Sequence, residues 1–221
     1  MYACVPLSDE VVRTTEFPAD QICTDDFTGK LANNTNLGQK GIVALEAFAQ
    51  LCGEMKSSSG VNCSHYSDVA SRYADVWVQY AYTDSPAPHY KMSFNEVAGV
   101  SDSWSLKYNL LWQRLLGLDG PFDWDKVVSA EIAYYISKAN AFGTPMDPRH
   151  SYVKTDWLSW AAAMTSNDAD FHTIMQVSVR CTPPRSVPPP SRPVTQPLTT
   201  RGLYVPPRLS RVQGPNLQVC E

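Results

Sequence analysis

The chain has 221 residues, 43% of them apolar and 11% aromatic, which is enough to bury a core in one large domain or two small ones. Its formal net charge is −4, but six arginines and a single acid lie beyond residue 177, so the body before that point is acidic. An acidic body argues against a nucleic-acid partner, and no stretch approaches the roughly 20 apolar residues of a membrane-spanning helix, so neither partner is expected.

Residues 1–35 are predicted to be irregular, with residues 1–17 as a separate N-terminal segment, because prolines, a glycine and a run of asparagines punctuate them. An amphipathic helix is predicted from Leu37 to Met55, since its apolar residues recur at three- and four-residue steps. Thr35 or Asn36 is the expected N-cap, because a short side-chain oxygen accepts from the unpaired backbone donors of the first turn.

Helical periodicity returns several times further along the chain. Residues 89–103 have no clear period and leave room for a short strand pair. Paired helices without alternating strand units indicate an all-α fold. The remaining helices are predicted at 64–82, 104–116, 123–140 (capped by Asp123), 156–165 and 168–176.

Residues 177–221 differ in composition from the body. They hold ten of the 17 prolines, which remove backbone donors and block helix, so this tail is predicted to be extended or disordered. It is interpreted as a linker, as a polyproline ligand for a partner domain, or as the product of a wrong reading frame after Gln176. The third interpretation is favoured because the apolar helical pattern of Phe171, Ile174 and Met175 stops there without a cap.

The six cysteines form no CxxC pair and have no metal-like spacing, so no metal site is expected. They are disulfide partners if the chain is exported and buried thiols if it is not, and Cys52 with Cys63 is the favoured local pair. Two triplets, Asn33-Asn34-Thr35 and Asn62-Cys63-Ser64, match the N-glycosylation acceptor pattern, which matters only in an exported chain. The N-terminus lacks the basic start and apolar run of a signal peptide.

Three polar clusters are candidates for chemistry. The first precedes the helix at residue 37 and the second holds two aromatic residues one helical turn apart. The third is a loop rich in ionisable groups that ends at a helix start. Each cluster also has an interpretation without chemistry. The first would be a helix-capping loop and the second a face of the core. In the third, Asp156 would cap a helix and Asp147 would form a salt bridge with Arg149. No nucleophile elbow, Walker loop or dinucleotide fingerprint is present, so hydrolysis by carboxylates or a loop nucleophile is the enzyme class that the residues indicate. The clusters comprise Asp25, Asp26 and Asn34; Trp104 and Tyr108; and Asp147, Arg149, His150, Lys154 and Asp156.

Three motifs in series resemble the fungal secreted glutaminase A family over residues 18–176: TDDFTGKLANNTNLGQKGIVAL, SWSLKYNLLWQRLLGL and GTPMDPRHSYVKTDWLSWAAAM. The resemblance implies part of an (α/α)6 toroid of six helical hairpins, extracellular location for the family, and cleavage of the side-chain amide of L-glutamine to glutamate and ammonia. The family's signal peptide, N-terminal β-rich region and further hairpins are not seen here, and its helix beyond the position of Gln176 is replaced by the tail. Exposed apolar faces on an incomplete toroid predict association.

On this resemblance, the carboxylates Asp25, Asp26 and Asp156 are the acid–base candidates. Arg149 or Lys154 would bind the substrate carboxylate, because cations pair with it and arginine can do so with two parallel bonds. Trp104 and Tyr108 would form an apolar wall, and Asn34 and His150 complete the expected substrate contacts, with no cofactor. The competing hypotheses are a carbohydrate hydrolase on the same toroid and a non-functional truncated gene product.

Overall fold

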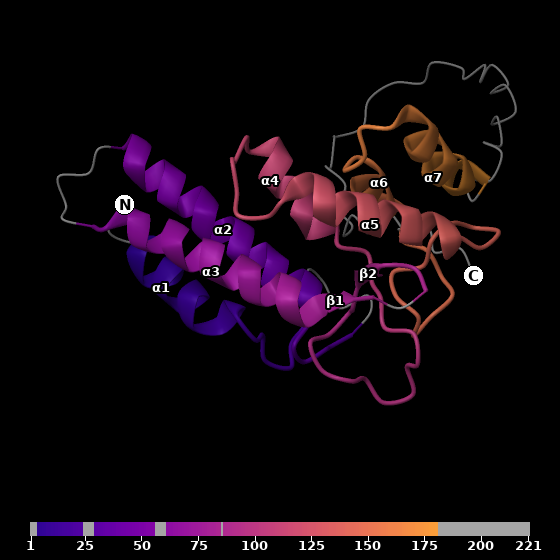
Figure 1. The fold of residues 1–221 in the computed structure, drawn as a ribbon, viewed down its shortest axis with the longest axis horizontal. Coiled ribbons are helices and arrows are strands. Elements are labelled where there is room, and N and C mark those ends of the chain that lie inside the picture. The colour runs from indigo at the N-terminus through magenta and orange to yellow at the C-terminus, as the bar shows by residue number, and fades with distance from the viewer. Residues whose placement is uncertain (1–3, 24–28, 56–60, 85, 181–221) are drawn as a thin grey trace, which may run out of the picture.

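The computed structural model describes residues 4–23, 29–55, 61–84 and 86–180, and these form an all-α arrangement with one short strand pair (Figure 1). The strand pair joins β1 (Tyr82–Thr83) to β2 (His89–Tyr90) in antiparallel register, with Tyr82 opposite Tyr90. None of the described helices is long and apolar enough to cross a membrane. The helices are α1 (Cys4–Thr15), α2 (Thr35–Glu54), α3 (Cys63–Ala81), the 3-10 turn η1 (Tyr108–Leu110), α4 (Leu111–Leu115), α5 (Trp124–Ser137), α6 (Thr155–Ala162) and α7 (Asp168–Arg180).

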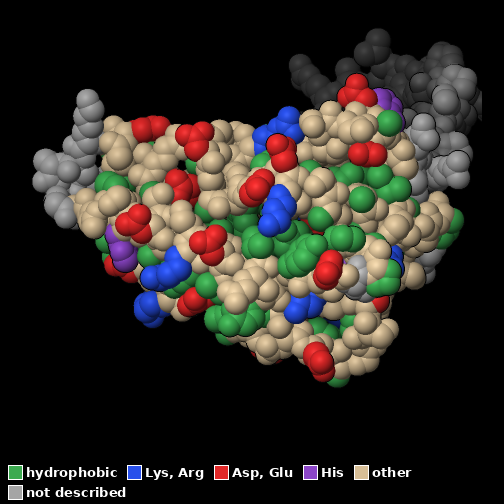
Figure 2. All heavy atoms as spheres, viewed as in Figure 1, with side chains coloured by type: hydrophobic (Ala, Val, Ile, Leu, Met, Phe, Trp, Pro, Cys, Tyr) green, Lys and Arg blue, Asp and Glu red, His purple; other side chains and the backbone are tan. Residues whose placement is uncertain are grey.

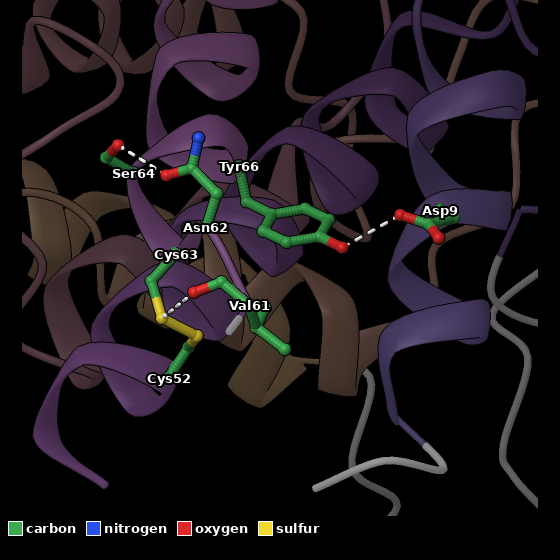
Figure 3. The surroundings of a disulfide bond; sticks show 7 residues. All are labelled: Asp9, Cys52, Val61, Asn62, Cys63, Ser64 and Tyr66. Carbon is green, nitrogen blue, oxygen red and sulfur yellow. Dashed lines mark hydrogen bonds between the residues drawn. A yellow bond between two sulfur atoms is a disulfide. The ribbon is translucent and has the colours of Figure 1, made fainter. Parts of the chain in front are cut away.

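The first half of the fold is an antiparallel hairpin of α2 and α3, whose bounds lie within two residues of the predicted ones (Figure 1). The predicted apolar faces meet in its core, where Ile42 and Leu45 of α2 and Trp77 of α3 are almost fully buried. The favoured Cys52–Cys63 pair is confirmed as a disulfide that joins the end of α2 to the start of α3 (Figure 3). Helix periodicity in the sequence therefore predicted this hairpin correctly.

The prediction of an irregular segment over residues 1–17 is wrong, because α1 occupies Cys4–Thr15. Pro6 lies in its first turn, where a helix needs no backbone N–H donor, so it does not interrupt the helix. Two tyrosines of α3 hold α1 in place: Tyr66 donates to Asp9 at 2.8 Å and Tyr73 donates to the Val12 carbonyl at 2.9 Å. These tertiary contacts hold α1 against α3, with Val11 and Val12 packed against the core.

The prediction of a helix from Trp104 is also wrong for its first four residues. The chain has no regular secondary structure from residue 103 to 107, and helical structure starts only at Tyr108. In this non-helical segment Leu106 N donates to the Met146 carbonyl at 2.8 Å, and Lys107 points into the core. These long-range hydrogen bonds outweigh the local helical pattern.

In the second half of the fold, α5 packs against β2, α4 and α6 contact η1, and α7 contacts both α5 and α6 (Figure 1). Asp123 caps α5 as predicted, accepting from Lys126 N at 3.2 Å. Helix α7 continues to Arg180, so the prediction that the extended tail begins at residue 177 is wrong for its first four residues. The rest of the predicted tail, from residue 181 onward, lies outside the described residues. Figure 2 shows acidic and basic side chains scattered singly over the face drawn, with apolar side chains gathered near its middle.

Candidate functional site

The structure brings residues of all three polar clusters to one small cavity. Asn34 comes from the start of α2, Tyr108 from η1, and Asp147 and Arg149 from the loop before α6. The cavity measures about 20 Å³, which is room for one water-sized group. Its full lining is Cys23, Leu31, Asn34, Asn36, Ser105, Leu106, Tyr108, Met146, Asp147 and Arg149.

Asn34, and neither Thr35 nor Asn36, is the N-cap of α2. Its Oδ1 accepts from the backbone of Asn36 at 2.9 Å and of Leu37 at 3.1 Å. The predicted caps were wrong because both residues are buried and used elsewhere. Thr35 Oγ1 donates to the Lys91 carbonyl at 2.6 Å, and Asn36 Oδ1 accepts from Asn109 N at 3.2 Å. Asn34 therefore fixes the helix start beside the cavity.

Cys23, which the sequence analysis did not select, lies at the cavity wall. Three donors point at its sulfur: Asn36 Nδ2 at 3.5 Å, Asn109 Nδ2 at 3.6 Å and Tyr108 OH at 3.9 Å. Sulfur accepts hydrogen bonds weakly as a thiol and more strongly as a thiolate, because negative charge strengthens the bond. The only sequence signal for this residue is its position two residues before Asp25.

Tyr108 is buried, as its core interpretation predicted, and its ring stacks on Trp157 of α6 with centroids 4.5 Å apart. Lys154 Nζ lies 4.0 Å from the Trp157 ring centroid and 2.5 Å from Asp156 Oδ2. These contacts tie the carboxylate of Asp156 to the aromatic wall of the cavity. The N-cap position of α6 is Lys154, so Asp156 lies in the first turn and is not the cap.

The two carboxylate oxygens of Asp156 differ. Oδ2 accepts a hydrogen bond from Lys154, whereas Oδ1 is buried. No side chain or backbone group in the described part of the chain donates to Oδ1. A carboxylate oxygen in that position has lone pairs left for a proton or a substrate donor. Asp156 does not itself line the small cavity.

The predicted Asp147–Arg149 salt bridge is confirmed. Arg149 Nε and NH2 donate to the two oxygens of Asp147 at 3.0 and 2.7 Å, and its NH1 reaches the Lys30 carbonyl at 3.5 Å. The hydrogen bonds to Asp147 raise the pKa of Arg149 above its ordinary value, so the guanidinium stays charged. The pair places opposite charges side by side at the cavity.

Like Lys154 and Asp156, the candidates Trp104 and His150 do not line this cavity. Trp104 is buried in the core against Tyr134, with ring centroids 6.1 Å apart, so it forms no shared wall with Tyr108. His150 is exposed and stacks on Tyr152 at 4.7 Å. The predicted carboxylates at positions 25 and 26 lie outside the described residues.

A buried ion pair lies beside the cavity and was not predicted. Lys107 and Glu131 are 0% and 1% exposed, with Nζ and Oε2 3.8 Å apart. Lys107 Nζ donates to three acceptors, Tyr90 O, Ser105 O and Ser105 Oγ, at 2.9 to 3.1 Å. Burial lowers the pKa of Lys107 and raises that of Glu131, whereas the attraction between the two charges opposes both shifts. Three acceptors around one nitrogen match the three donors of an ammonium group, so the pair is charged.

Glu131 is satisfied by two further donors. Tyr90 N donates to Oε1 at 2.8 Å, and Tyr135 OH donates to Oε2. Tyr135 OH in turn accepts from Lys107 N at 2.7 Å. This network holds segment 103–107, which supplies Ser105 and Leu106 to the cavity wall. In the part of the chain that the structure describes, no three His, Cys, Asp or Glu side chains are placed to hold a metal ion.

Comparison with known proteins gives a consistent result. Residues 10–183 match the glutaminase A six helical-hairpin domain. The chain is 32% identical to glutaminase A of Aspergillus oryzae over 176 residues, which is 78% of this chain and 24% of that protein. It is 26% identical to a probable glutaminase of Arthroderma benhamiae over 174 residues, which is 67% of this chain and 19% of that protein. No solved structure matches. The chain thus spans about a quarter or less of the length of these relatives.

Proposed function

This chain belongs to the glutaminase A six helical-hairpin domain family, and on that premise we propose that it supplies part of the active site of an amidohydrolase that cleaves the side-chain amide of L-glutamine to glutamate and ammonia. The two relatives are a glutaminase A and a probable glutaminase. Family membership rests on the comparisons, and we propose in addition that the substrate is glutamine.

The observation that carries the proposal is the convergence of the three clusters. Asn34, Tyr108 and Arg149 are separated by up to 115 positions in the sequence, yet all three line one cavity. Capping and core packing alone do not require a salt-bridged arginine, a tyrosine and an amide to meet at a hollow. Amide hydrolysis does require polar groups that converge on one point.

The charged groups suit the reaction. Arg149 binds Asp147 through Nε and NH2, and its NH1 makes only a long contact of 3.5 Å, so that nitrogen has donor capacity for a substrate carboxylate. Asp156 Oδ1 has no partner among the described residues, but it is buried and does not line the cavity. It can take a proton from an attacking water and return it to the leaving ammonia only if the reacting amide lies beyond the cavity, toward α6. The stacked rings of Tyr108 and Trp157 form the aromatic wall of the site.

The size of the cavity limits what enters it. A space of about 20 Å³ admits one polar group and not a whole amino acid, so we infer that only one end of glutamine occupies it. The rest of the substrate would lie toward the solvent side, where Arg149 is 20% exposed.

The test is ammonia release from L-glutamine by the purified full chain, beside Asp156→Asn and the matched control Asp75→Asn. Asp75 is an exposed aspartate in the middle of α3, away from the cavity. Loss of an acid–base group lowers turnover by about 10²- to 10⁴-fold, whereas the control should equal the parent. Equal turnover in all three proteins would show that Asp156 has no part in the reaction.

A second variant addresses the substrate carboxylate. Arg149→Lys keeps one positive charge but removes the planar fork, so KM for L-glutamine should rise more than kcat falls. The α-carboxamide analogue of glutamine lacks the carboxylate, so the parent and Arg149→Lys should have similar KM values for it. An unchanged KM in this variant would remove Arg149 from substrate binding. Activity on a panel of glycosides with none on glutamine would instead favour a carbohydrate hydrolase.

A further inference from the structure

The two N-glycosylation triplets have very different surroundings in the folded chain. One begins at Asn33 beside the candidate site, and the other begins at Asn62 at the start of α3. An acceptor asparagine must be exposed, and the hydroxyl two residues later must be accessible for the triplet to be used. The structure distinguishes the two on both counts.

Asn62 is exposed, and so is Ser64 (Figure 3). Asn62 occupies the N-cap position of α3 but makes no side-chain cap hydrogen bond. Its Oδ1 instead accepts from Ser64 Oγ at 2.9 Å, so the amide and the hydroxyl of the triplet already face each other. Among the described residues no hydrogen bond engages Nδ2, and Figure 3 shows this nitrogen pointing away from Tyr66 and the disulfide. A substituent on Nδ2 therefore breaks no bond of the fold.

In the folded chain, the triplet that begins at Asn33 is not accessible to a modifying enzyme. Asn33 adopts a left-handed backbone conformation with φ of 55°, and its backbone is bonded on both sides, to Pro18 O at 2.7 Å and from Phe94 N at 3.0 Å. Thr35 is fully buried, and its Oγ1 donates to the Lys91 carbonyl at 2.6 Å. In the folded chain this hydroxyl is out of reach.

The disulfide provides an independent observation about the compartment. Cys63, the middle residue of the second triplet, is bonded to Cys52. Such bridges form and persist in oxidising compartments, among them the lumen in which eukaryotic cells attach N-linked sugars. A chain that acquires this bridge is therefore exposed to the glycosylation machinery at the same stage.

We propose that Asn62 is an N-glycosylation site. In the transfer, Asn62 Nδ2 attacks the anomeric carbon of an oligosaccharide carried on a polyprenyl diphosphate. The bond from that carbon to the diphosphate oxygen breaks, the polyprenyl diphosphate leaves, and Nδ2 loses one proton as the N-glycosidic bond forms. No oxidant or reductant takes part.

There is space for the sugar next to the acceptor. A surface hollow of about 430 Å³ is lined by Cys63, Ser64 and the loop after α4, including Gly117 and Asp119. The glycan also lies far from the candidate site, because Asn34 is at the opposite end of α2, a helix of 20 residues and hence about 30 Å long. The inference does not depend on the proposed glutaminase activity.

The test is to express the full chain behind a cleavable export signal in a yeast host and to analyse the secreted protein. Peptide-N-glycosidase treatment in ¹⁸O-labelled water converts a glycosylated asparagine to labelled aspartate, which peptide mass spectrometry locates. We expect the label at Asn62 in most molecules and a gel shift on deglycosylation that is absent in Asn62→Gln.

Two further variants keep the result unambiguous. Ser64→Ala retains the asparagine and should also lose the glycan, whereas Ser64→Thr should keep it. Asn33→Gln is the matched control and should leave the gel shift unchanged. An unlabelled Asn62 in the secreted parent chain, or a glycan that persists at Asn62 in Ser64→Ala, would overturn the proposal.

Discussion

Replacing Lys107 with methionine should strongly destabilise the chain. The ammonium group is fully buried, lies 3.8 Å from Glu131 Oε2 and donates three hydrogen bonds. Methionine fills a similar volume but offers no donor, so the carboxylate of Glu131 would remain buried without its counter-charge. Removing one partner of a buried ion pair costs about 3 to 5 kcal/mol. For a chain of this length that corresponds to a fall in Tm of roughly 6 to 20 °C.

The pH dependence gives this prediction a second readout. Burial raises the pKa of Glu131 above its ordinary value, and loss of Lys107 removes the attraction that opposes this shift. A carboxyl whose folded pKa is raised contributes stability below its unfolded pKa of about 4.3, and that contribution is lost as pH rises through the folded value. The deficit of Lys107→Met should therefore be largest near neutral pH and should shrink as pH falls toward about 4.3.

Urea denaturation followed by tryptophan fluorescence, at neutral and acid pH, measures both effects. The double variant Lys107→Met, Glu131→Gln should recover more than half of the loss, because a neutral glutamine still accepts from Tyr90 N. Lys126→Met is the matched control on the exposed face of α5 and should stay within about 0.5 kcal/mol of the parent. A deficit for Lys107→Met no larger than this control, or one that is equal at both pH values, would refute the reasoning.

Three further predictions concern other parts of the fold. Cys63→Ser opens the bridge to a residue 11 positions away and should cost about 2 to 3 kcal/mol, a difference that disappears when the parent is measured in reductant. Asn34→Ala leaves two backbone donors of α2 unpaired and should cost about 1 kcal/mol, while Asn34→Asp should retain most of the cap and thus the thermal midpoint. Partial burial raises the pKa of Asp102, but hydrogen bonds from Lys138 and Tyr134 bring the pKa below its ordinary value. Its contribution is therefore present above about pH 4 and lost as pH falls through the folded pKa, so urea midpoints of Asp102→Asn and the parent should differ near pH 6 and converge near pH 3.

The sequence alone determined the elements that local residue spacing and capping side chains are sufficient to specify. Helices α2, α3 and α5 follow from apolar residues at helical spacing, and the Asp123 cap follows from the chemistry of a short side-chain oxygen. The Cys52–Cys63 bridge followed from two cysteines flanking a short loop. The motifs also indicated the family, which the comparison with known proteins confirms.

Tertiary structure decided the rest, because those features depend on partners far away in the sequence. Helix α1 packs against tyrosines 57 and 61 positions later, and the helical pattern at Trp104 is overridden by long-range hydrogen bonds such as that from Leu106 N to the Met146 carbonyl. Cys23 meets Asn109 across 86 positions, and the charges of Lys107 and Glu131 are visible in the sequence while their burial is not. A local pattern records which face of an element is apolar, but the packing of distant elements determines which polar groups are removed from water together, and that packing forms both the candidate site and the buried ion pair beside it.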